Sequence, residues 1–318
     1  MEVPGRKYDL LVITGPTASG KTAIAAAVAA LTGGEIISAD SRQVYRRMDI
    51  GTGKDLADYI VDGRKIPFHL VDIAEPGYKY NVFEYQRDFL KVYEDITARG
   101  CFPVVCGGSG MYVDSIVSGY RLAEVPPDEK LRKELENHTM EELTAILKTY
   151  KSLHNTTDID TRKRAIRAIE IEKFYREHDM KIVPFPALST LIVGIKNERE
   201  ERRERITKRL KERLANGMIE EVQDLLDSGL SSEDLIYYGL EYKYITLYLT
   251  GLMTWDEMFS TLEVEIHRFA KRQMTWFRGM ERRGIRINWI DGSLPGETIV
   301  QLIIDLLTCS PPTPQGGL

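Results

Sequence analysis

The residues best suited to chemistry form one run near the N-terminus, Gly15-Pro16-Thr17-Ala18-Ser19-Gly20-Lys21-Thr22. The run matches the pattern GxxxxGK[ST] between an apolar segment and an alanine-rich one, which is the strand–loop–helix context of a phosphate-binding loop (P-loop). Its glycines let successive N–H groups face one anion, and the following helix N-terminus adds positive potential. Lys21 would neutralise terminal phosphate charge, and the Thr22 hydroxyl would ligate Mg²⁺. The motif predicts a polyphosphate ligand without identifying it as ATP, and it disfavours a ligand-free turn.

A carboxylate follows the second predicted strand, in the segment 38–45 (SADSRQVY). Asp40 is expected at the carboxyl edge of a parallel sheet, beside the P-loop. There it can accept a proton from a nucleophile directed at a bound phosphate ester. Because Asp and Ser are also common helix N-caps, position alone leaves the two interpretations equal.

Two other predicted strand ends carry candidate ligands. Residues 107–110 (GGSG) offer N–H groups and the Ser109 hydroxyl to an oxygen-rich ligand, and a plain strand-to-helix turn is an equal alternative. Asp72 ends the apolar run 69–71 and resembles in position the Mg²⁺-binding aspartate of NTPases. A role as a strand-end turn residue is the favoured alternative for Asp72.

Three basic clusters contrast with the net charge of −5. The first lies at 162–167. The second, at 202–213, is interleaved with glutamates, which is typical of a solvated, ion-paired helix face. The third, at 268–286, has one acid and contains Trp276 and Phe277. This composition favours a nucleic-acid surface over a core aromatic pair on a basic helix.

These candidate residues can lie together only if the fold brings the ends of several strands to one edge of a sheet. Short apolar runs typical of buried parallel strands occur at 10–13, 35–38, 68–73, 103–106 and 190–195. They alternate with helical patterns at 22–31 and 81–99, and a late strand is expected at 286–290. The alternation predicts an α/β, P-loop NTPase-like fold, a parallel sheet with helices on both faces.

The stretch 121–185 differs in pattern, since it is polar, helical and bounded by prolines. It predicts a helical insertion domain within the sheet domain. The expected organisation is a discontinuous core of residues 1–120 and 186–309, an insertion at 121–185 and a flexible tail at 310–318.

Composition limits the class of protein. Of the 318 residues, 43% are hydrophobic and 29% charged, which excludes wholesale disorder. Three cysteines without a CxxC pair exclude a disulfide framework or a four-cysteine zinc site. The N-terminus lacks a signal-peptide pattern, and no apolar stretch is long enough to span a bilayer. We expect a cytoplasmic monomer without a membrane partner.

In this order, the motifs resemble the tRNA dimethylallyltransferase (tRNA isopentenyltransferase) family in its bacterial form, which lacks a zinc finger. GPTASGKT is similar to the family P-loop, and residues 37–54 resemble its aspartate segment and MDIGT stretch. PVVCGGSGMYV resembles its glycine-glycine-threonine element, with Ser109 in the threonine's place. RERITKRLKERLANGMIEEV is similar to its arginine helix, and AKRQMTWFR to its C-terminal signature.

The resemblance implies transfer of a dimethylallyl group from dimethylallyl diphosphate to N6 of the adenosine 3′-adjacent to a tRNA anticodon. The P-loop would bind the diphosphate, with Thr22 on Mg²⁺. Asp40 would be the general base, Ser109 would stand near the reacting centre, and Lys21 and Arg205 would bind the diphosphate. The resemblance places the contacts to the tRNA anticodon stem-loop at Asp40, Ser41, Arg42, Gln43, Ser109, Lys163, Arg164, Arg167, Lys271, Arg272 and Arg278.

The chain departs from the family pattern in three places, one of which is the insertion, where an Asp-Pro-x-x-Ala element is lacking before His154-Asn155. Glu241-Tyr242-Lys243-Tyr244 stands where the family has Gly-Tyr-Lys/Arg-Glu/Gln, and Gly53-Lys54-Asp55 where it usually has Ala-Lys-Pro. These changes concern the tRNA contacts and fit a divergent paralogue with an altered RNA preference. Three alternatives stay open: a P-loop kinase of small molecules, a prenyltransferase of free adenine nucleotides, and a non-catalytic RNA-binding paralogue.

Overall fold

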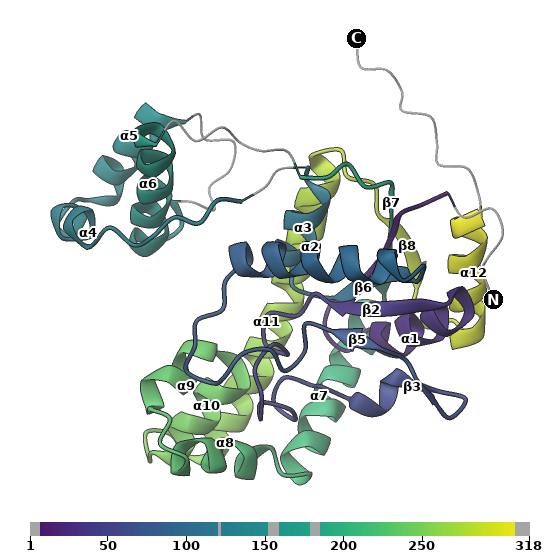
Figure 1. Ribbon diagram of the computed structural model, residues 1–318. Helices are drawn as coiled ribbons and strands as arrows, with labels where there is room; N and C mark the ends of the chain where they lie inside the picture. The colour runs from purple at the N-terminus through teal and green to yellow at the C-terminus, as the bar shows by residue number, and fades with distance from the viewer. Residues whose placement is uncertain (1–6, 120–121, 152–158, 179–184, 309–318) are drawn as a thin grey trace. The chain divides into compact units, whose positions relative to one another are not determined.

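The computed structural model describes residues 7–119, 122–151, 159–178 and 185–308 (Figure 1). The chain forms two compact units, one of Met1–Gly119 with Pro186–Leu318 and one of Tyr120–Phe185. The predicted tail at 310–318 and Cys309 lie outside the described residues. Cys101 and Cys106 are free thiols.

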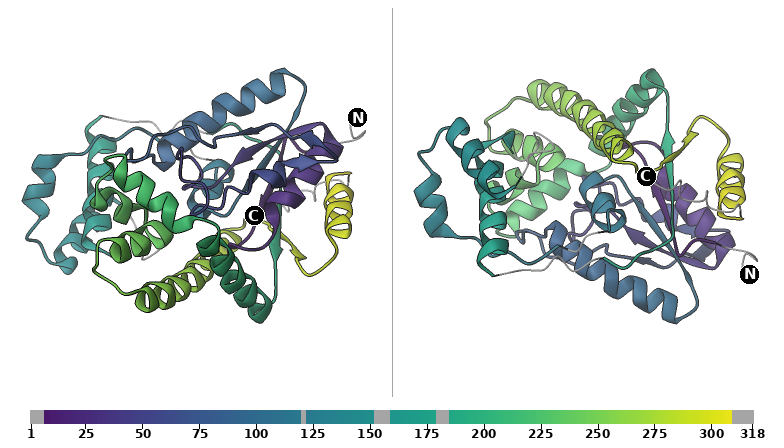
Figure 2. Two further views of the ribbon diagram at one scale, coloured as in Figure 1. Left: turned by 90° about the horizontal axis from the view of Figure 1, so that it is seen from below. Right: turned by 90° about the horizontal axis from the view of Figure 1, so that it is seen from above.

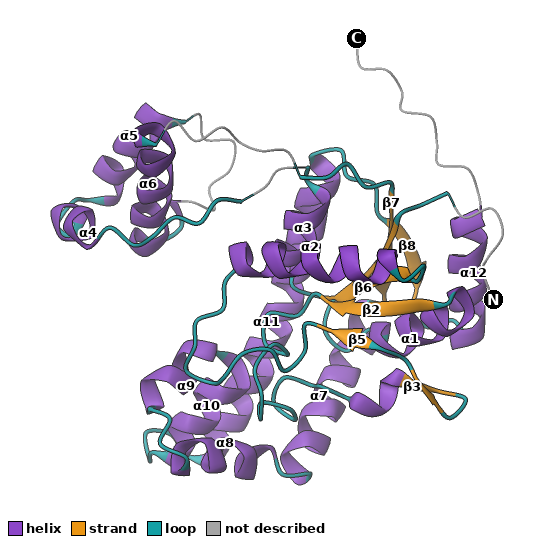
Figure 3. Ribbon diagram, in the orientation of Figure 1, coloured by secondary structure: helices purple, strands orange, loops and turns teal. Residues whose placement is uncertain are grey.

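The larger unit is built on a six-stranded sheet, drawn in orange in Figure 3. Its strands are β1 (Leu10–Thr14), β2 (Gly34–Ser38), β5 (Phe68–His69), β6 (Phe102–Gly107), β7 (Thr190–Lys196) and β8 (Asn288–Asp291). They lie in the order β5-β2-β6-β1-β7-β8, and all neighbours are parallel. The predicted parallel α/β sheet is confirmed. Every residue of β1, β2 and β6 is buried, which explains why apolar residues predominate in them. The charged residue among them, Glu35 of β2, pairs with Arg99 and His69.

Helices cover both faces of the sheet, with α2 on the opposite side from α1 and α12 (Figure 1). The four helices concerned are α1 (Lys21–Thr32), α2 (Val82–Ala98), α3 (Gly110–Val117) and α12 (Gly296–Thr308). Ile24 of α1 and Ile303 of α12 share one apolar core with Leu11 and Val104 of the sheet. A capping box between Asn81 and Glu84 fixes the start of α2.

Five further helices follow β7 in the same unit. They are α7 (Arg199–Ala215), α8 (Met218–Asp227), α9 (Ser232–Tyr238), α10 (Leu240–Leu249) and α11 (Trp255–Arg282). Helices α7 and α11 contact each other and lie side by side in both views of Figure 2. Their core includes Tyr45 and Met48 from the loop after β2, so this loop is anchored to the helices as well as to the sheet.

Two details of the sheet differ from the sequence prediction. The strand expected at 68–73 ends at His69, because Leu70 and Asp72 adopt positive φ angles of 60° and 56°, outside the β region. A short hairpin of β3 (Ile60–Val61) and β4 (Arg64–Lys65), preceded by the 3₁₀ helix η1 (Leu56–Tyr59), was not predicted.

The smaller unit contains α4 (Glu129–Leu135), α5 (Met140–Tyr150) and α6 (Arg162–Glu177), and its described residues include no strand. Leu143 and Leu147 of α5 pack with Ala165 and Ile169 of α6 in its core. Of the helices that the structure describes in either unit, none has both the length and the hydrophobicity needed to cross a bilayer.

Candidate active site

The P-loop connects β1 to α1 at the carboxyl edge of the sheet. Gly20 is the N-cap of α1 and provides no side-chain cap, so N–H groups of the first turn are free to bind an anion. Lys21 Nζ lies 3.4 Å from the Pro16 carbonyl oxygen, and burial lowers the pKa of this lysine. In the described structure the Ser19 hydroxyl is buried and has no hydrogen-bond partner. The loop therefore presents N–H donors and a half-buried cation, an arrangement suited to binding an anion.

The loop after β2 carries Asp40, which lines the same cavity as Lys21 and Thr22 of the P-loop. Asp40 Oδ1 accepts hydrogen bonds from the backbone N–H of Arg42 at 2.8 Å and of Gln43 at 3.4 Å. Asp40 therefore caps the turn at 41–44, and the helix N-cap that the sequence allowed is not formed, because no helix begins there. The turn occupies one carboxylate oxygen of Asp40, and Asp40 also lines the cavity described below. Capping of the turn and a catalytic role are therefore compatible.

Ser109 joins the loop after β6 to the loop after β2. Its Oγ accepts a hydrogen bond from Ser41 N at 2.9 Å and lies 3.2 Å from Ser41 Oγ. Gly107 is required at this crossing, because a Cβ there would lie 2.2 Å from the Ala39 carbonyl oxygen. The predicted GGSG ligand segment thus also serves to hold the Asp40 loop.

These loops enclose a cavity of about 470 Å³, within the usual range for ligand sites. Predicted residues that line it include Lys21, Thr22, Asp40, Ser41, Arg42, Gln43, Ser109 and Arg272. Its other walls come from α7, α10 and α11, and they include residues that the sequence analysis did not select for the site: Arg209, Arg213, Glu241, Tyr242 and Gln273.

Helix α7 supplies the arginines, but the structure does not place Arg205 on the cavity. Arg205 pairs with Glu201 at 2.7 Å and lines an outer hollow beside the start of α1. Arg209 and Arg213, one and two turns further along, line both the hollow and the cavity. Each helical turn moves a side chain about 5.4 Å along the axis, so Arg209 and Arg213 also reach the cavity. Arg205 shares the outer hollow with Ser19, Lys21 and Thr22 of the P-loop, and its contact with the diphosphate stays a prediction. The interpretation of the basic cluster at 202–213 as a solvated helix face holds only for those of its residues that do not line the cavity.

Gln273 of α11 links two of the ligand loops. Its Oε1 accepts a hydrogen bond from Thr17 N at 2.9 Å, and its Nε2 donates to the Gly108 carbonyl oxygen at 2.8 Å. A buried glutamine on the apolar face of α11 was the sequence signal for this role, and the family signature AKRQMTWFR contains it. Gln273 therefore fixes the P-loop against the loop after β6.

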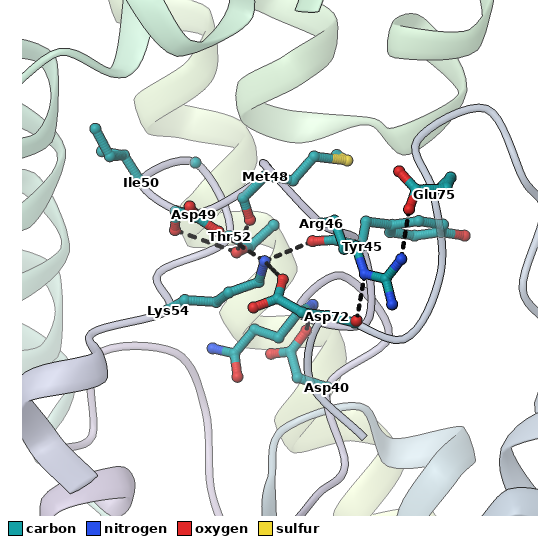
Figure 4. Close-up of polar contacts among 12 residues, drawn as sticks. Asp40, Tyr45, Arg46, Met48, Asp49, Ile50, Thr52, Lys54, Asp72 and Glu75 are labelled. Carbon is teal, nitrogen blue, oxygen red and sulfur yellow. Dashed lines mark hydrogen bonds and ion pairs between the residues drawn. The ribbon is translucent and has the colours of Figure 1, made fainter. Parts of the chain in front are cut away.

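Lys54 anchors the segment that follows the Asp40 loop (Figure 4). Its ammonium group is buried and donates to the Tyr45 carbonyl oxygen and to the carboxylates of Asp49 and Asp72. Arg46 Nε donates to the Asp72 carbonyl oxygen at 2.8 Å. Among the described residues, those that line the cavity do not include Asp72. The structure therefore favours the turn interpretation of Asp72 over the metal role.

Replacing Lys54 is expected to destabilise the protein. In Lys54→Met, two carboxylates and a carbonyl lose their buried donor, which should lower the free energy of unfolding by about 2–3 kcal/mol. Urea denaturation measures this change. Lys91→Met is the control, since Lys91 is 70% exposed and its loss should cost less than about 0.5 kcal/mol. Equal urea midpoints for the two variants would contradict the anchoring role.

The predicted Mg²⁺ site fits the donors that are present. The Thr22 side chain lines both the cavity and the outer hollow. Among the described residues, no group of three His, Cys, Asp or Glu side chains could hold a metal ion. Mg²⁺ commonly takes few protein ligands and completes its shell with substrate phosphates and water. One hydroxyl at the start of the helix that follows the P-loop is consistent with that mode of binding.

The predicted tRNA-binding residues of the insertion lie on α6. Lys163 and Arg164 are exposed, and Arg164 pairs with Asp160 at 3.1 Å. Arg167 is half-buried and binds Glu170 at 3.1 Å and the Val125 carbonyl oxygen at 2.8 Å. Arg167 thus has a structural role within the insertion, and its contact with tRNA stays a prediction.

The basic cluster on α11 is exposed on one side only. Lys271, Arg272 and Arg278 are exposed, as a nucleic-acid surface requires. Phe277 is fully buried and contacts Trp289, and Trp276 packs against Gly110. The expectation that this aromatic pair serves an RNA surface is wrong for Phe277, which is a core residue.

The fold and the cavity define an α/β P-loop protein in which the anion-binding loop faces a carboxylate, Asp40, across one cavity. Family comparison agrees with this class and narrows it. A model described as IPP transferase matches residues 43–280, and one described as isopentenyl transferase matches residues 8–72.

Two relatives match nearly the whole chain. The "tRNA dimethylallyltransferase 2" of Bacteroides fragilis is 62% identical over 296 residues, which cover 93% of this chain and 97% of the relative. The "tRNA dimethylallyltransferase 1" of Parabacteroides distasonis is 58% identical over 302 residues, covering 95% and 98%. The chain belongs to the IPP transferase family, as the motifs predicted.

Solved structures agree with the fold. A tRNA isopentenylpyrophosphate transferase from Bacillus halodurans superposes with a TM-score of 0.69 at 30% identity, covering 95% of this chain and 96% of that one. A eukaryotic dimethylallyltransferase acting on tRNA gives a TM-score of 0.77 at 19% identity, covering 96% and 81%. At that identity the second likeness supports the fold alone.

Proposed function

We propose that this chain is a tRNA dimethylallyltransferase. It transfers the dimethylallyl group of dimethylallyl diphosphate to N6 of the adenosine 3′-adjacent to the anticodon. The observation that carries the proposal is the placement of Lys21, Arg209 and Asp40 around one cavity. The names of relatives up to 62% identical, which are tRNA dimethylallyltransferases, support the same activity. We also propose that it acts as a monomer, in the cytoplasm.

The chemistry needs a leaving group held firmly and an amine made more nucleophilic. A bond forms between N6 and C1 of the dimethylallyl group, and the C1–O bond breaks, with the electron pair leaving on diphosphate. Lys21, Arg209 and the N–H groups of the P-loop stabilise the charge that develops there. Asp40 accepts the proton from N6, and Ser109 and Ser41 hold the Asp40 loop in place.

Thr22 would hold Mg²⁺ together with the diphosphate and water, and the bound ion would supply further positive charge to the leaving group. The arginine next to the diphosphate is Arg209 in this proposal. The family resemblance assigned that role to Arg205, which pairs with Glu201 and lines the outer hollow with the P-loop, and its contact with the diphosphate stays a prediction.

The decisive experiment is a transfer assay with purified protein, Mg²⁺, radiolabelled dimethylallyl diphosphate and unmodified tRNA, with AMP as a parallel acceptor. Label in tRNA and none in AMP is the expected result. Label in AMP alone would identify an adenine-nucleotide prenyltransferase. Label in neither, with hydrolysis of the γ-phosphate in a parallel reaction that contains ATP, would favour a kinase. Binding of tRNA without transfer would identify a non-catalytic RNA-binding protein.

The exposed cations of α11 are expected to bind the tRNA backbone. In Arg278→Glu, tRNA binding should weaken, and the slope of log K against log salt should become shallower by about one, because a phosphate contact and its released counterion are lost. Filter binding across a salt titration measures the slope. Lys91→Glu, an equal charge change on α2, is the control. Identical slopes for Arg278→Glu and wild type would remove α11 from the RNA interface.

A further inference from the structure

Arg213 is a buried cation whose charge is poorly matched within the protein. Its side chain is 15% exposed, and its nearest ion-pair contact is Asp55 Oδ2, 3.8 Å from Nη2. That carboxylate oxygen is already bound by Arg209 at 2.6 Å. Within the described structure, no atom accepts a hydrogen bond from Arg213 Nη2. Burial of an unpaired guanidinium nitrogen is costly, so a protein that keeps one gains from it elsewhere.

The position of Arg213 indicates what its partner would be. It lines the large cavity together with Lys21 and Asp40, and it lines the outer hollow together with Ser19 and Thr22. Both spaces meet at the start of α1, where backbone N–H groups favour an anion. The Ser19 hydroxyl there is also buried without a partner in the described structure. Two donors without a hydrogen-bond partner in the described structure thus lie at the anion-binding loop, the Ser19 hydroxyl within it and Arg213 Nη2 beside it.

The loop after β2 leaves room for this guanidinium. A Cβ at Gly53 would lie 1.9 Å from Arg213 Nη2 and 2.6 Å from Arg209 Nη2, so both side chains pack directly on the Gly53 backbone. Glu241 lines the cavity and a smaller hollow together with Arg213. Gly53 and Glu241 are both among the positions where the chain departs from its family's pattern, so the surroundings of Arg213 are a distinctive part of this site.

We propose that Arg213 binds a phosphate oxygen of the prenyl donor, as a second guanidinium beside Arg209. The inference rests on the proposed function and adds a donor-binding residue to it. A guanidinium matches the geometry of phosphate and forms paired, charge-assisted hydrogen bonds to it. The donor diphosphate is favoured over a tRNA phosphate because Arg213 shares its two spaces with P-loop residues.

The test measures binding of inorganic diphosphate and Mg²⁺ by calorimetry, without tRNA. Arg213→Met should weaken binding about 10–100-fold, the range expected for a lost hydrogen bond to a charged group. Arg213→Lys should recover part of the loss. In the transfer assay, the Arg213→Met variant should show a raised KM for dimethylallyl diphosphate. Lys211→Met is the control, because Lys211 is an exposed cation of the same helix that lines neither space.

A double variant tests whether Arg213 binds the donor diphosphate or only neutralises the charge of Glu241. Arg213→Met alone leaves the Glu241 carboxylate uncompensated, and that charge would itself repel diphosphate. In Arg213→Met/Glu241→Gln the carboxylate charge is also absent. If Arg213 binds the donor, the double variant still binds diphosphate weakly. Recovery of wild-type affinity in the double variant would overturn the inference.

The remaining outcomes distinguish this inference from the proposed function. Wild-type protein that binds no diphosphate would refute the proposed function itself. Wild-type protein that binds diphosphate and modifies tRNA, with equal affinity in Arg213→Met, would refute the inference alone. Weakened binding of a tRNA anticodon stem-loop with unchanged diphosphate affinity would assign Arg213 to a tRNA phosphate, and would also refute it.

Discussion

Replacement of Asp40 by asparagine is expected to slow prenyl transfer about 10²–10⁴-fold, the usual contribution of a general base. The asparagine carbonyl oxygen can still accept the N–H bonds of Arg42 and Gln43 that Asp40 Oδ1 accepts now. The turn should therefore persist, while the group that takes the N6 proton is lost. Single-turnover transfer with saturating donor and tRNA measures the effect, because it reports the chemical step rather than binding.

Asp40→Ala supplies the matched comparison, because it removes both the base and the acceptor of the turn. We expect it to lose transfer as Asp40→Asn does, and also to lose about 1 kcal/mol of stability, as at other capping positions. Diphosphate binding should persist in both variants, since the P-loop donors are untouched. Full activity in Asp40→Asn would show that Asp40 only caps the turn.

The parts of this site that could be predicted from sequence are those set by local geometry. The P-loop, Asp40 and Ser109 each follow a short apolar strand, and parallel strands bring such ends to one edge. Side chains whose contacts depend on how a helix packs against the sheet could not be assigned to the site from sequence. Arg205, Arg209 and Arg213 repeat every four residues along α7, and the position of the helix along its axis decides which of them reach the cavity as well as the outer hollow.

Asp72 shows a second limit. Its place after an apolar run suggested a strand end with a metal ligand, yet the strand stops at His69 and the carboxylate pairs with Lys54, 18 positions away in the sequence. No local pattern encodes such a pairing. Phe277 is different, because a usable signal was present: with Ala270, Gln273 and Met280 it forms the buried stripe of α11 at helical spacing.

The second large effect is expected at Lys21, where activity and stability should change in opposite directions. Lys21→Met removes the buried cation nearest the leaving group, and kcat/KM should fall about 10²–10³-fold, as for loss of one preorganised donor to a developing charge. The same change removes a buried charge whose recorded hydrogen bond is a 3.4 Å contact with Pro16. Without ligand, the variant should therefore be as stable as wild type or about 1 kcal/mol more stable.

The free energy of unfolding measured against pH tests whether the charge of Lys21 destabilises the folded protein. Burial lowers the pKa of Lys21 below its usual 10.5, so the unfolded chain binds more protons than the folded one between the two pKa values. Between the two pKa values, below pH 10.5, the free energy of unfolding of the wild type should therefore rise with pH. The Lys21→Met variant should lack this rise. Diphosphate should remove the difference by favouring the charged lysine. A variant that loses stability and activity together would instead show that Lys21 supports the fold.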